Sequence, residues 1–299
     1  MILLTGATGL VGAAVLRRLT RSAAQVRCLV RDPRQLGDQR VNVQIALGDL
    51  AEPQSFRHAL RGVETVVHLA ASIRDQGEPG RGCSIEELNG VGTWRLVEGA
   101  ERAGVKRLLF ISSLGASTLS SARFLRAKAM AEEAVVGSGL DYTVFAPSAV
   151  YAQGDAFLRL FARLSLLPVV PLSGRGEALF QPIWAEDVAE CVMAVINGGG
   201  ESGLGSRRYE LGGPETISYA EMVDLAIRAA GRRRSVVSVP LGICEPALRV
   251  AQLVAGRPVV ATQDEVALLE VTMTTPRGTA DAQALGVSPR AMAAVLGIE

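Results

Sequence analysis

A glycine-rich turn stands between an apolar segment and a helical segment at the start of the chain. The apolar run Ile2–Leu4 is followed by Thr-Gly-Ala-Thr-Gly-Leu-Val-Gly and then by residues 13–19, which read as a helix. Gly6 can make the tight turn off the strand, Gly9 leaves room for the backbone to approach a phosphate, and Gly12 lets the helix pack closely on the strand. The positive N-terminal end of that helix is then placed to bind phosphate groups.

The three glycines are spaced as G-x-x-G-x-x-G. The first gap is one residue longer than in the G-x-G-x-x-G dinucleotide fingerprint. A glycine-rich turn of some other α/β protein is therefore an open alternative, and motifs further along the chain have to decide between the two.

Strand and helix patterns alternate along the first half of the chain. The strands are nearly continuous apolar runs, as expected for strands covered on both faces. The alternation predicts an α/β fold, a Rossmann doubly wound parallel sheet. The predicted strands are residues 25–30, 41–47, 65–70, 105–112 and 142–146, and the predicted helices between them are residues 53–60, 85–103 and 122–136.

The alternation loosens after residue 154. We therefore predict a dinucleotide-binding Rossmann domain in residues 1–155, joined by parts of 178–212, and a smaller, mainly helical C-terminal lobe in residues 156–299 that serves a substrate or a partner. Ser218 and Glu221 predict the capping box of a helix over 218–230. Leu166–Pro171 is predicted as an apolar turn. The apolar stretch 241–256 is predicted to be lobe core, a cover for a substrate cleft, a docking face or a membrane-surface contact.

Composition narrows the classes of partner. A net charge of +1 with 20% charged residues gives no indication of nucleic-acid binding, and no apolar run reaches membrane-spanning length. Cys28 and Cys191 lie in apolar runs without disulfide spacing, which predicts buried free thiols and a cytoplasmic protein. Two histidines and no ligand cluster predict no metal site.

The end of the second predicted strand indicates which dinucleotide is bound. Leu-Val-Arg-Asp-Pro places Arg31 directly after the strand and Arg34 close by. A guanidinium can pair with a 2′-phosphate, whereas a carboxylate there would bind the ribose 2′-hydroxyl. NADP(H) is therefore favoured, with NAD(H) possible because Asp32 follows Arg31.

Two further strand ends complete the predicted cofactor site. Asp49 in Gly-Asp-Leu can accept a hydrogen bond from the adenine amino group, and Leu50 can cover the ring. Leu69, Ala70 and Ala71 end the fourth strand with small side chains that leave room for ribose and diphosphate. We interpret His68 as a core residue.

Eight motifs along the chain, taken in order, resemble those of an atypical short-chain dehydrogenase/reductase of the epimerase/dehydratase type. They are T-G-A-T-G-L-V-G, L-V-R-D-P, G-D-L, V-V-H-L-A-A, I-S-S-L-G-A, A-K-A-M-A-E, D-Y-T-V-F-A-P-S-A-V-Y and I-W-A-E-D-V-A. Within that superfamily, residues 1–240 are most similar to the nucleotide-binding accessory subunit of respiratory complex I and its bacterial relatives. The resemblance implies a cofactor site formed by Gly6, Thr8, Gly9, Leu10, Val11, Gly12, Arg31, Asp49, Leu50, Leu69, Ala70, Ala71, Lys128 and Pro147.

The resemblance also implies a departure at the catalytic position. The superfamily's Y-x-x-x-K motif matches Phe124–Lys128, so the lysine is present and the phenol is absent. The resemblance assigns Lys128 to the nicotinamide ribose and Ser113 to the carbonyl-orienting hydroxyl. Asn89 matches a helix position of the family's site. The alternative is that its amide is a helix-interior group hydrogen-bonded to the backbone. Tyr151 is a possible substitute phenol.

Two functions remain open at this point. In the first, the protein holds the cofactor in a structural or sensing role and acts through a protein partner. In the second, it is an NADPH-dependent reductase or epimerase-like oxidoreductase with another proton donor. The small-molecule substrate and the protein partner are unknown.

Overall fold

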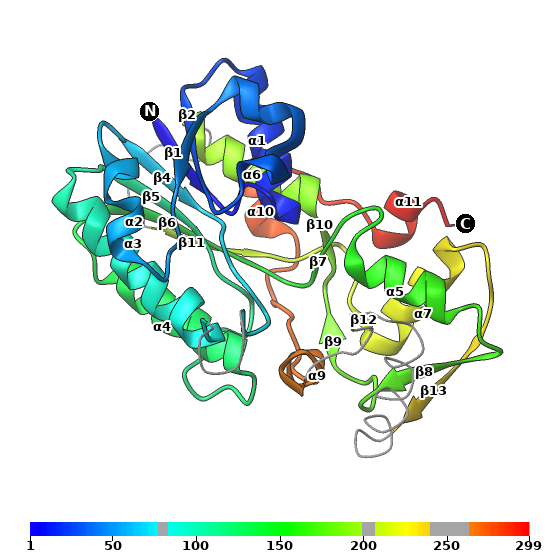
Figure 1. Cartoon of the computed structure of the whole chain (residues 1–299). Coiled ribbons are helices and arrows are strands. Elements are labelled where there is room, and N and C mark those ends of the chain that lie inside the picture. Colours follow the sequence, from blue (N-terminus) through cyan, green and yellow to red (C-terminus); the bar gives the residue numbers. More distant parts are fainter. Residues whose placement is uncertain (77–82, 199–206, 240–262, 299) are drawn as a thin grey trace.

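The computed structural model describes residues 1–76, 83–198, 207–239 and 263–298. Its main feature is a parallel sheet of seven strands in the order β11-β6-β5-β4-β1-β2-β3. Helices cover both faces of this sheet (Figure 1). The predicted Rossmann doubly wound fold is thus confirmed. The strands are β1 (Ile2–Thr5), β2 (Val26–Val30), β3 (Gln44–Leu47), β4 (Thr65–His68), β5 (Arg107–Ile111), β6 (Asp141–Pro147) and β11 (Arg207–Leu211).

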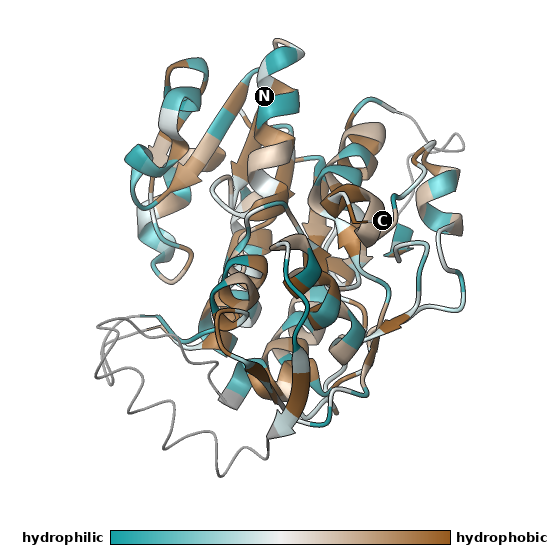
Figure 2. Ribbon diagram, turned by 90° about the vertical axis from the view of Figure 1, so that its right-hand side faces the viewer, coloured by the Kyte–Doolittle hydropathy of each residue, from teal (hydrophilic) through white to brown (hydrophobic). Residues whose placement is uncertain are grey.

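Alternate residues of one strand enter two different hydrophobic cores. Leu3 of β1 packs with α3 (Gly92–Arg102) and α4 (Arg123–Val136), while Leu4 packs with α1 (Leu10–Arg21) and α6 (Ala185–Ile196). Both leucines are fully buried. A strand buried on both faces needs apolar residues at consecutive positions, which explains the continuous apolar runs in the sequence. In Figure 2 the strands are accordingly coloured mainly hydrophobic.

Two predicted helices are divided into shorter elements. Residues 53–60 form α2 (Pro53–Phe56) and a 3₁₀ turn η2 (Arg57–Leu60), and residues 85–103 contain a π-helical turn η3 (Glu87–Val91) before α3. The predicted strand 41–47 begins only at Gln44, after the 3₁₀ segment η1 (Pro33–Asn42). Side-chain periodicity does not distinguish α from 3₁₀ or π turns, so these divisions were not predicted.

The C-terminal elements form a smaller, mainly helical lobe beside the sheet (Figure 1). Its helix α7 (Tyr219–Ala229) begins with the predicted capping box, in which Ser218 and Glu221 satisfy each other's backbone N–H groups. Cys28 and Cys191 are buried free thiols, as predicted. The lobe and the segments that link it to the sheet contain β7 (Val150–Tyr151), α5 (Ala156–Leu164), β8 (Val169–Ser173), β9 (Leu179–Phe180), β10 (Ile183–Trp184), β12 (Ile217–Ser218), α7 (Tyr219–Ala229), β13 (Ser235–Val239), α9 (Gln263–Leu269), α10 (Ala280–Ala284) and α11 (Met292–Leu296).

The prediction of a turn over Leu166–Pro171 is wrong in its second half. Val169–Ser173 is strand β8, and it pairs in parallel with β13. Pro171 lies opposite Val237 in this two-stranded sheet. A proline is tolerated there because each strand has a free edge toward which a missing N–H can point.

The large sheet and the smaller lobe are not separate along the sequence, because segments from the second half of the chain pack on the sheet. Helix α6 packs on α1, and β11 extends the large sheet beside β6. Farther along, Ala282, Leu285 and Val287 enter the core on the α1 side of the sheet. The domain limits stay a prediction, and the apolar stretch 241–256 lies outside the described residues.

Candidate functional site

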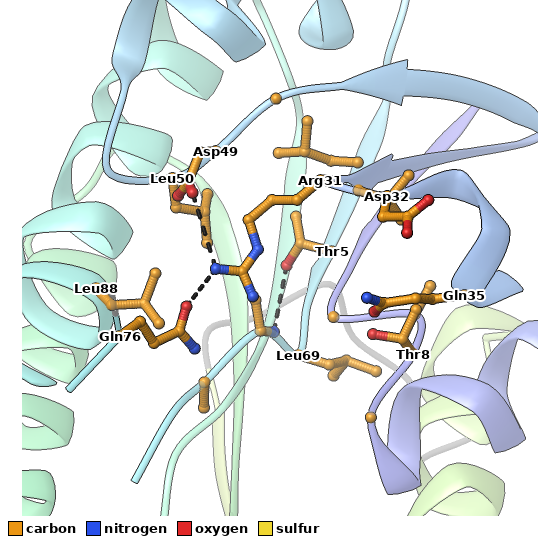
Figure 3. Close-up of a pocket in the computed structure, with 18 residues that line it drawn as sticks. Thr5, Thr8, Arg31, Asp32, Gln35, Asp49, Leu50, Leu69, Gln76 and Leu88 are labelled. Atoms are coloured by element: carbon orange, nitrogen blue, oxygen red, sulfur yellow. Dashed lines mark hydrogen bonds and ion pairs between the residues drawn. The ribbon is translucent and has the colours of Figure 1, made fainter. Parts of the chain in front are cut away.

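A cavity of about 210 Å³ opens at the carboxyl ends of β1, β2 and β4, next to the N-terminus of α1 (Figure 3). In an open α/β sheet this edge is the usual position of a nucleotide. The structure brings most of the predicted cofactor residues together here. The cavity is lined by residues 5–9, 29–32, 35, 48–50, 69–71, 76 and 88.

The three glycines of the turn have different structural requirements. Gly6 has φ +70°, and a Cβ on it would lie 2.4 Å from the backbone nitrogen of Ala70. A Cβ on Gly12 would lie 1.9 Å from the Gly6 carbonyl oxygen, so α1 could not pack where it does. A Cβ on Gly9 would meet that oxygen only at 3.4 Å, which is an ordinary contact. Gly6 and Gly12 are therefore required by the fold, whereas the fold leaves room for a side chain at Gly9.

The N-terminus of α1 is suited to an anion. Gly9 is its N-cap, and among the described residues no side chain caps it and no acidic residue stands in its first turn. The first N–H groups of a helix have no intrahelical acceptor, and the helix dipole makes this end positive. The end of α1 can thus bind a diphosphate at the open side of Gly9.

Arg31 extends across the opposite end of the cavity (Figure 3). Its guanidinium donates a hydrogen bond to the side-chain oxygen of Gln76 and lies 3.9 Å from a carboxylate oxygen of Asp49. Asp32 instead accepts from the backbone N–H of Arg34 at 3.0 Å and caps the following turn. The Arg31 side chain is 60% exposed, so the guanidinium remains accessible to a ligand.

Gln76 was not found by the sequence analysis. It comes from the segment after β4, which has no recognisable motif, and its place beside Arg31 depends on a bridge to Cys83. Leu88, Gln35 and Leu29 also line the cavity without having been predicted. Of the predicted cofactor residues, Leu10, Val11, Gly12, Lys128 and Pro147 do not form its wall.

The sequence profile of a family described as NAD(P)H-binding matches residues 6–198. The chain belongs to this family. It is 30% identical over 232 residues to the NADH dehydrogenase [ubiquinone] 1 alpha subcomplex subunit 9 of Arabidopsis thaliana, a match that covers 74% of this chain but only 55% of that mitochondrial protein. It is 28% identical to an NAD(P)H azoreductase of Xenophilus azovorans over 81% of this chain and 78% of the relative.

Solved structures agree with the fold. An NADPH-dependent quinone oxidoreductase of Escherichia coli, solved with NADPH, superposes with a TM-score of 0.74 at 20% identity and covers 99% of both chains. The family match and the identity to the complex I subunit confirm the predicted resemblance to atypical short-chain dehydrogenase/reductases, including complex I accessory subunits. No helix in the described ranges is long and apolar enough to cross a membrane.

A buried chain of hydrogen bonds supports the floor of the cavity. Thr93 donates to the Asn89 carbonyl at 2.6 Å, so its oxygen accepts from Nε2–H of His68 at 2.9 Å. Nδ1 of His68 is then left to accept from the Thr5 hydroxyl at 2.6 Å, and Thr5 accepts from the Ala70 N–H at 3.3 Å. Burial, aided by the nearby Lys128, lowers the pKa of His68 to about 3. His68 is a neutral structural residue, as expected.

Asn89 also has a structural position. Its side chain donates to the backbone carbonyls of Ser72 and Ile85 and accepts from the Ser72 N–H. It lies in the π-helical turn η3 and is 1% exposed. Its amide therefore holds the segment that leads from β4 toward Gln76, which corresponds to the backbone-bonded alternative.

Lys128 is buried between two aromatic rings. Its Nζ donates to the carbonyl of Ile111 at 2.7 Å and lies 4.8 Å and 5.7 Å from the ring centres of Phe110 and Phe124. Burial lowers the pKa of Lys128 to about 7, although Glu132 acts in the opposite direction. The ring at position 124 is that of a phenylalanine and carries no hydroxyl.

The remaining catalytic candidates lie along the ends of β5 and β6. The Ser113 hydroxyl is buried and donates to the Leu114 carbonyl at 3.2 Å. The Pro147 carbonyl accepts from the Leu114 N–H at 2.9 Å. The Tyr151 hydroxyl is buried without a hydrogen-bond partner in the described part of the chain, and burial raises its pKa. The catalytic roles of Ser113 and Lys128 stay predictions. The described residues include no cluster of three or more potential metal ligands.

Proposed function

We propose that this chain holds NADP(H) across the glycine turn and that the bound cofactor has a structural or sensing role. The diphosphate lies at the N-terminus of α1, where Gly9 has an open face. The adenosine lies between Leu50 and Asp49 on one side and Leu69 on the other. The observation that carries the proposal is the Arg31 guanidinium, which extends into this end of the cavity while Asp32 is engaged with its own turn.

The non-catalytic role is supported by the environment of Lys128. A phenol at position 124 would supply a proton to an alkoxide. General acid catalysis of this kind raises the reaction rate about 10²- to 10⁴-fold. Phe124 has no proton to give, and the Lys128 amine is 1% exposed and bonded to Ile111. The bound nicotinamide would supply hydride chemistry, but the position that matches the superfamily's proton donor is Phe124.

Substituting Arg31 tests the cofactor site. In the Arg31→Ala variant we expect NADPH to bind about 10- to 100-fold more weakly, because a hydrogen-bonded ion pair to the 2′-phosphate is lost. NADH, which has no such phosphate, should change little. The measurement is a fluorescence titration of nucleotide-stripped protein with each reduced cofactor.

Arg57→Ala is the matched control, since Arg57 is exposed on η2 and does not line the cavity. It should bind both cofactors like the wild type. Equal losses for NADPH and NADH in Arg31→Ala would contradict NADP(H) preference, and absence of binding in the wild type would refute the cofactor site.

Restoring the phenol tests whether the chain is catalytically silent. We expect the wild type to oxidise NADPH with quinone or aldehyde probes no faster than the background, and Phe124→Tyr to raise the rate about 100-fold. Phe124→Leu, which changes the ring without adding a hydroxyl, should remain at background. Steady-state NADPH absorbance measures all three.

The alternative is an NADPH-dependent reductase, and the similarity to a relative named as an azoreductase favours it. Rapid turnover by the wild type, unchanged in Phe124→Tyr, would support this alternative. The proton donor would then be water, a substrate group or another hydroxyl such as that of Tyr151.

A further inference from the structure

The outer surface of the smaller lobe exposes a group of apolar side chains far from the dinucleotide cavity. They are Leu166 (67% exposed), Leu167 (46%), Val169 (44%) and Val237 (50%). They lie on the α5–β8 loop and on the two-stranded β8–β13 sheet, at the end of the lobe remote from β1 and β2 (Figure 1). We call these four residues, together with Arg232 and Arg233, the distal patch.

The exposure follows from the pairing of β8 with β13. Val170 and Leu172 of β8 face the lobe core and are buried, so the alternate position Val169 faces outward. Val237 of β13 is half-exposed as well, whereas its neighbour Val236 packs against the lobe core. The outward positions of β8 and β13 therefore carry apolar side chains that the lobe core does not bury.

Arginines border these apolar residues. Arg232, Arg233 and Arg234 follow α7 in one run. The Arg234 side chain donates to the carbonyls of Ser165 at 3.0 Å and Leu167 at 3.1 Å, which fixes the run against the α5–β8 loop. Arg233 is exposed and Arg232 partly so.

A hollow of about 490 Å³ lies within the basic border. Among the described residues, Arg228, Arg233, Arg234, Ser235 and Asp224 line it. The Arg234 guanidinium is held there by the backbone carbonyls of Ser165 and Leu167. The hollow is large enough for a phosphate-bearing group. An anion placed there would be adjacent to the apolar side chains of the patch.

We propose that the distal patch docks this protein on an anionic membrane surface. Headgroup phosphates occupy the arginine-lined hollow, and Leu166 and Leu167 enter the boundary between headgroups and acyl chains. Apolar residues beside a basic border match both parts of such a surface, since lipid phosphates attract the arginines and the acyl chains accept the leucines. An acidic protein partner would satisfy the charge but would leave the leucines beside carboxylates.

Vesicle co-sedimentation of the full chain tests the proposal. We expect binding to vesicles that contain phosphatidylglycerol, little binding to pure phosphatidylcholine, and weakening at high salt because the charge attraction is screened. Arg232→Glu/Arg233→Glu should weaken binding at least about 10-fold. Leu166→Ser/Leu167→Ser should also weaken it, but without reducing the salt dependence.

The matched controls are Arg57→Glu/Arg61→Glu, two exposed arginines beside the large sheet, and Leu119→Ser, a leucine that is 93% exposed elsewhere. Both should bind vesicles like the wild type, and thermal unfolding checks that every variant is folded. Equal binding by patch and control variants, or no preference for phosphatidylglycerol, would overturn the proposal.

Two other occupants have distinct results, each of which would also overturn it. Binding of inorganic phosphate with no binding to vesicles would indicate a small-anion site. A dimer in light scattering that is lost in Leu166→Ser/Leu167→Ser, again without vesicle binding, would indicate that the patch contacts a second copy of the chain. Cofactor titration of the same variants should be unchanged, so this test is independent of the proposed NADP(H) site.

Discussion

Replacing Gly12 with alanine is expected to destabilise the protein by at least about 3 kcal/mol, because a new methyl group would overlap the backbone of the glycine turn. The Cβ would lie 1.9 Å from the Gly6 carbonyl oxygen and 3.0 Å from the Ala7 Cα, and backbone atoms cannot move aside as a flexible side chain can. Helix α1 would have to shift away from β1 and break its packing with α6. Soluble yield and the midpoint of thermal unfolding measure the effect.

Gly9→Ala is the matched control for stability. Its Cβ finds only the Gly6 oxygen at 3.4 Å, so unfolding should stay within about 1 kcal/mol of the wild type. Its dinucleotide binding should nevertheless fall at least about 10-fold, because the methyl group occupies the approach of the diphosphate. Wild-type stability in Gly12→Ala would refute the close packing of α1 on the turn. Wild-type cofactor affinity in Gly9→Ala would refute the proposed diphosphate position.

Replacing Lys128 with methionine is expected to stabilise the protein near neutral pH. The folded protein holds this amine almost fully buried with a pKa lowered to about 7, against 10.5 as its ordinary value. Below pH 7 the folded state carries a buried charge and bears the full cost of its desolvation. Methionine has a similar shape without the charge. The variant also loses the hydrogen bond to Ile111. After this loss we expect the free energy of unfolding to increase by about 1–3 kcal/mol at low pH.

The stability gained in Lys128→Met should depend on pH, and its direction follows from where the Lys128 proton is bound. Between pH 7 and 10.5 the unfolded chain binds the Lys128 proton and the folded protein does not, so wild-type stability rises with pH in this window. The advantage of Lys128→Met should therefore be largest below pH 7 and shrink toward pH 10. Denaturant unfolding of both proteins across this range measures it. An advantage that is constant with pH would contradict a buried amine that loses its proton in the folded state.

Lys106→Met is the control, because Lys106 is the only other lysine of the chain and its side chain is 75% exposed. It should change stability little and with no comparable slope in pH. If both variants behave alike, the effect belongs to the loss of a surface charge and not to burial of Lys128.

Local sequence signals account for much of the fold and for the centre of the cavity. The glycine turn specifies a strand, a turn and a helix within a dozen residues, because Gly9 and Gly12 contact only the backbone of the turn itself. The capping box of Ser218 and Glu221 formed as predicted for the same reason. The strand ends that carry Arg31 and Asp49 meet at one edge of the sheet because parallel strands place all their carboxyl ends together.

What the sequence determined by itself is therefore the alternation of strands and helices in the first half of the chain, the glycine turn and the edge of the sheet at which the cavity forms. Only the tertiary structure decided that Gln76 meets Arg31, that β8 pairs with β13, and that Lys128 lies between Phe110 and Phe124. These contacts join segments far apart along the chain, or set the burial of a single group. Spacing within a short segment carries no information about which distant segment will cover it, because that depends on how all the elements share the same core.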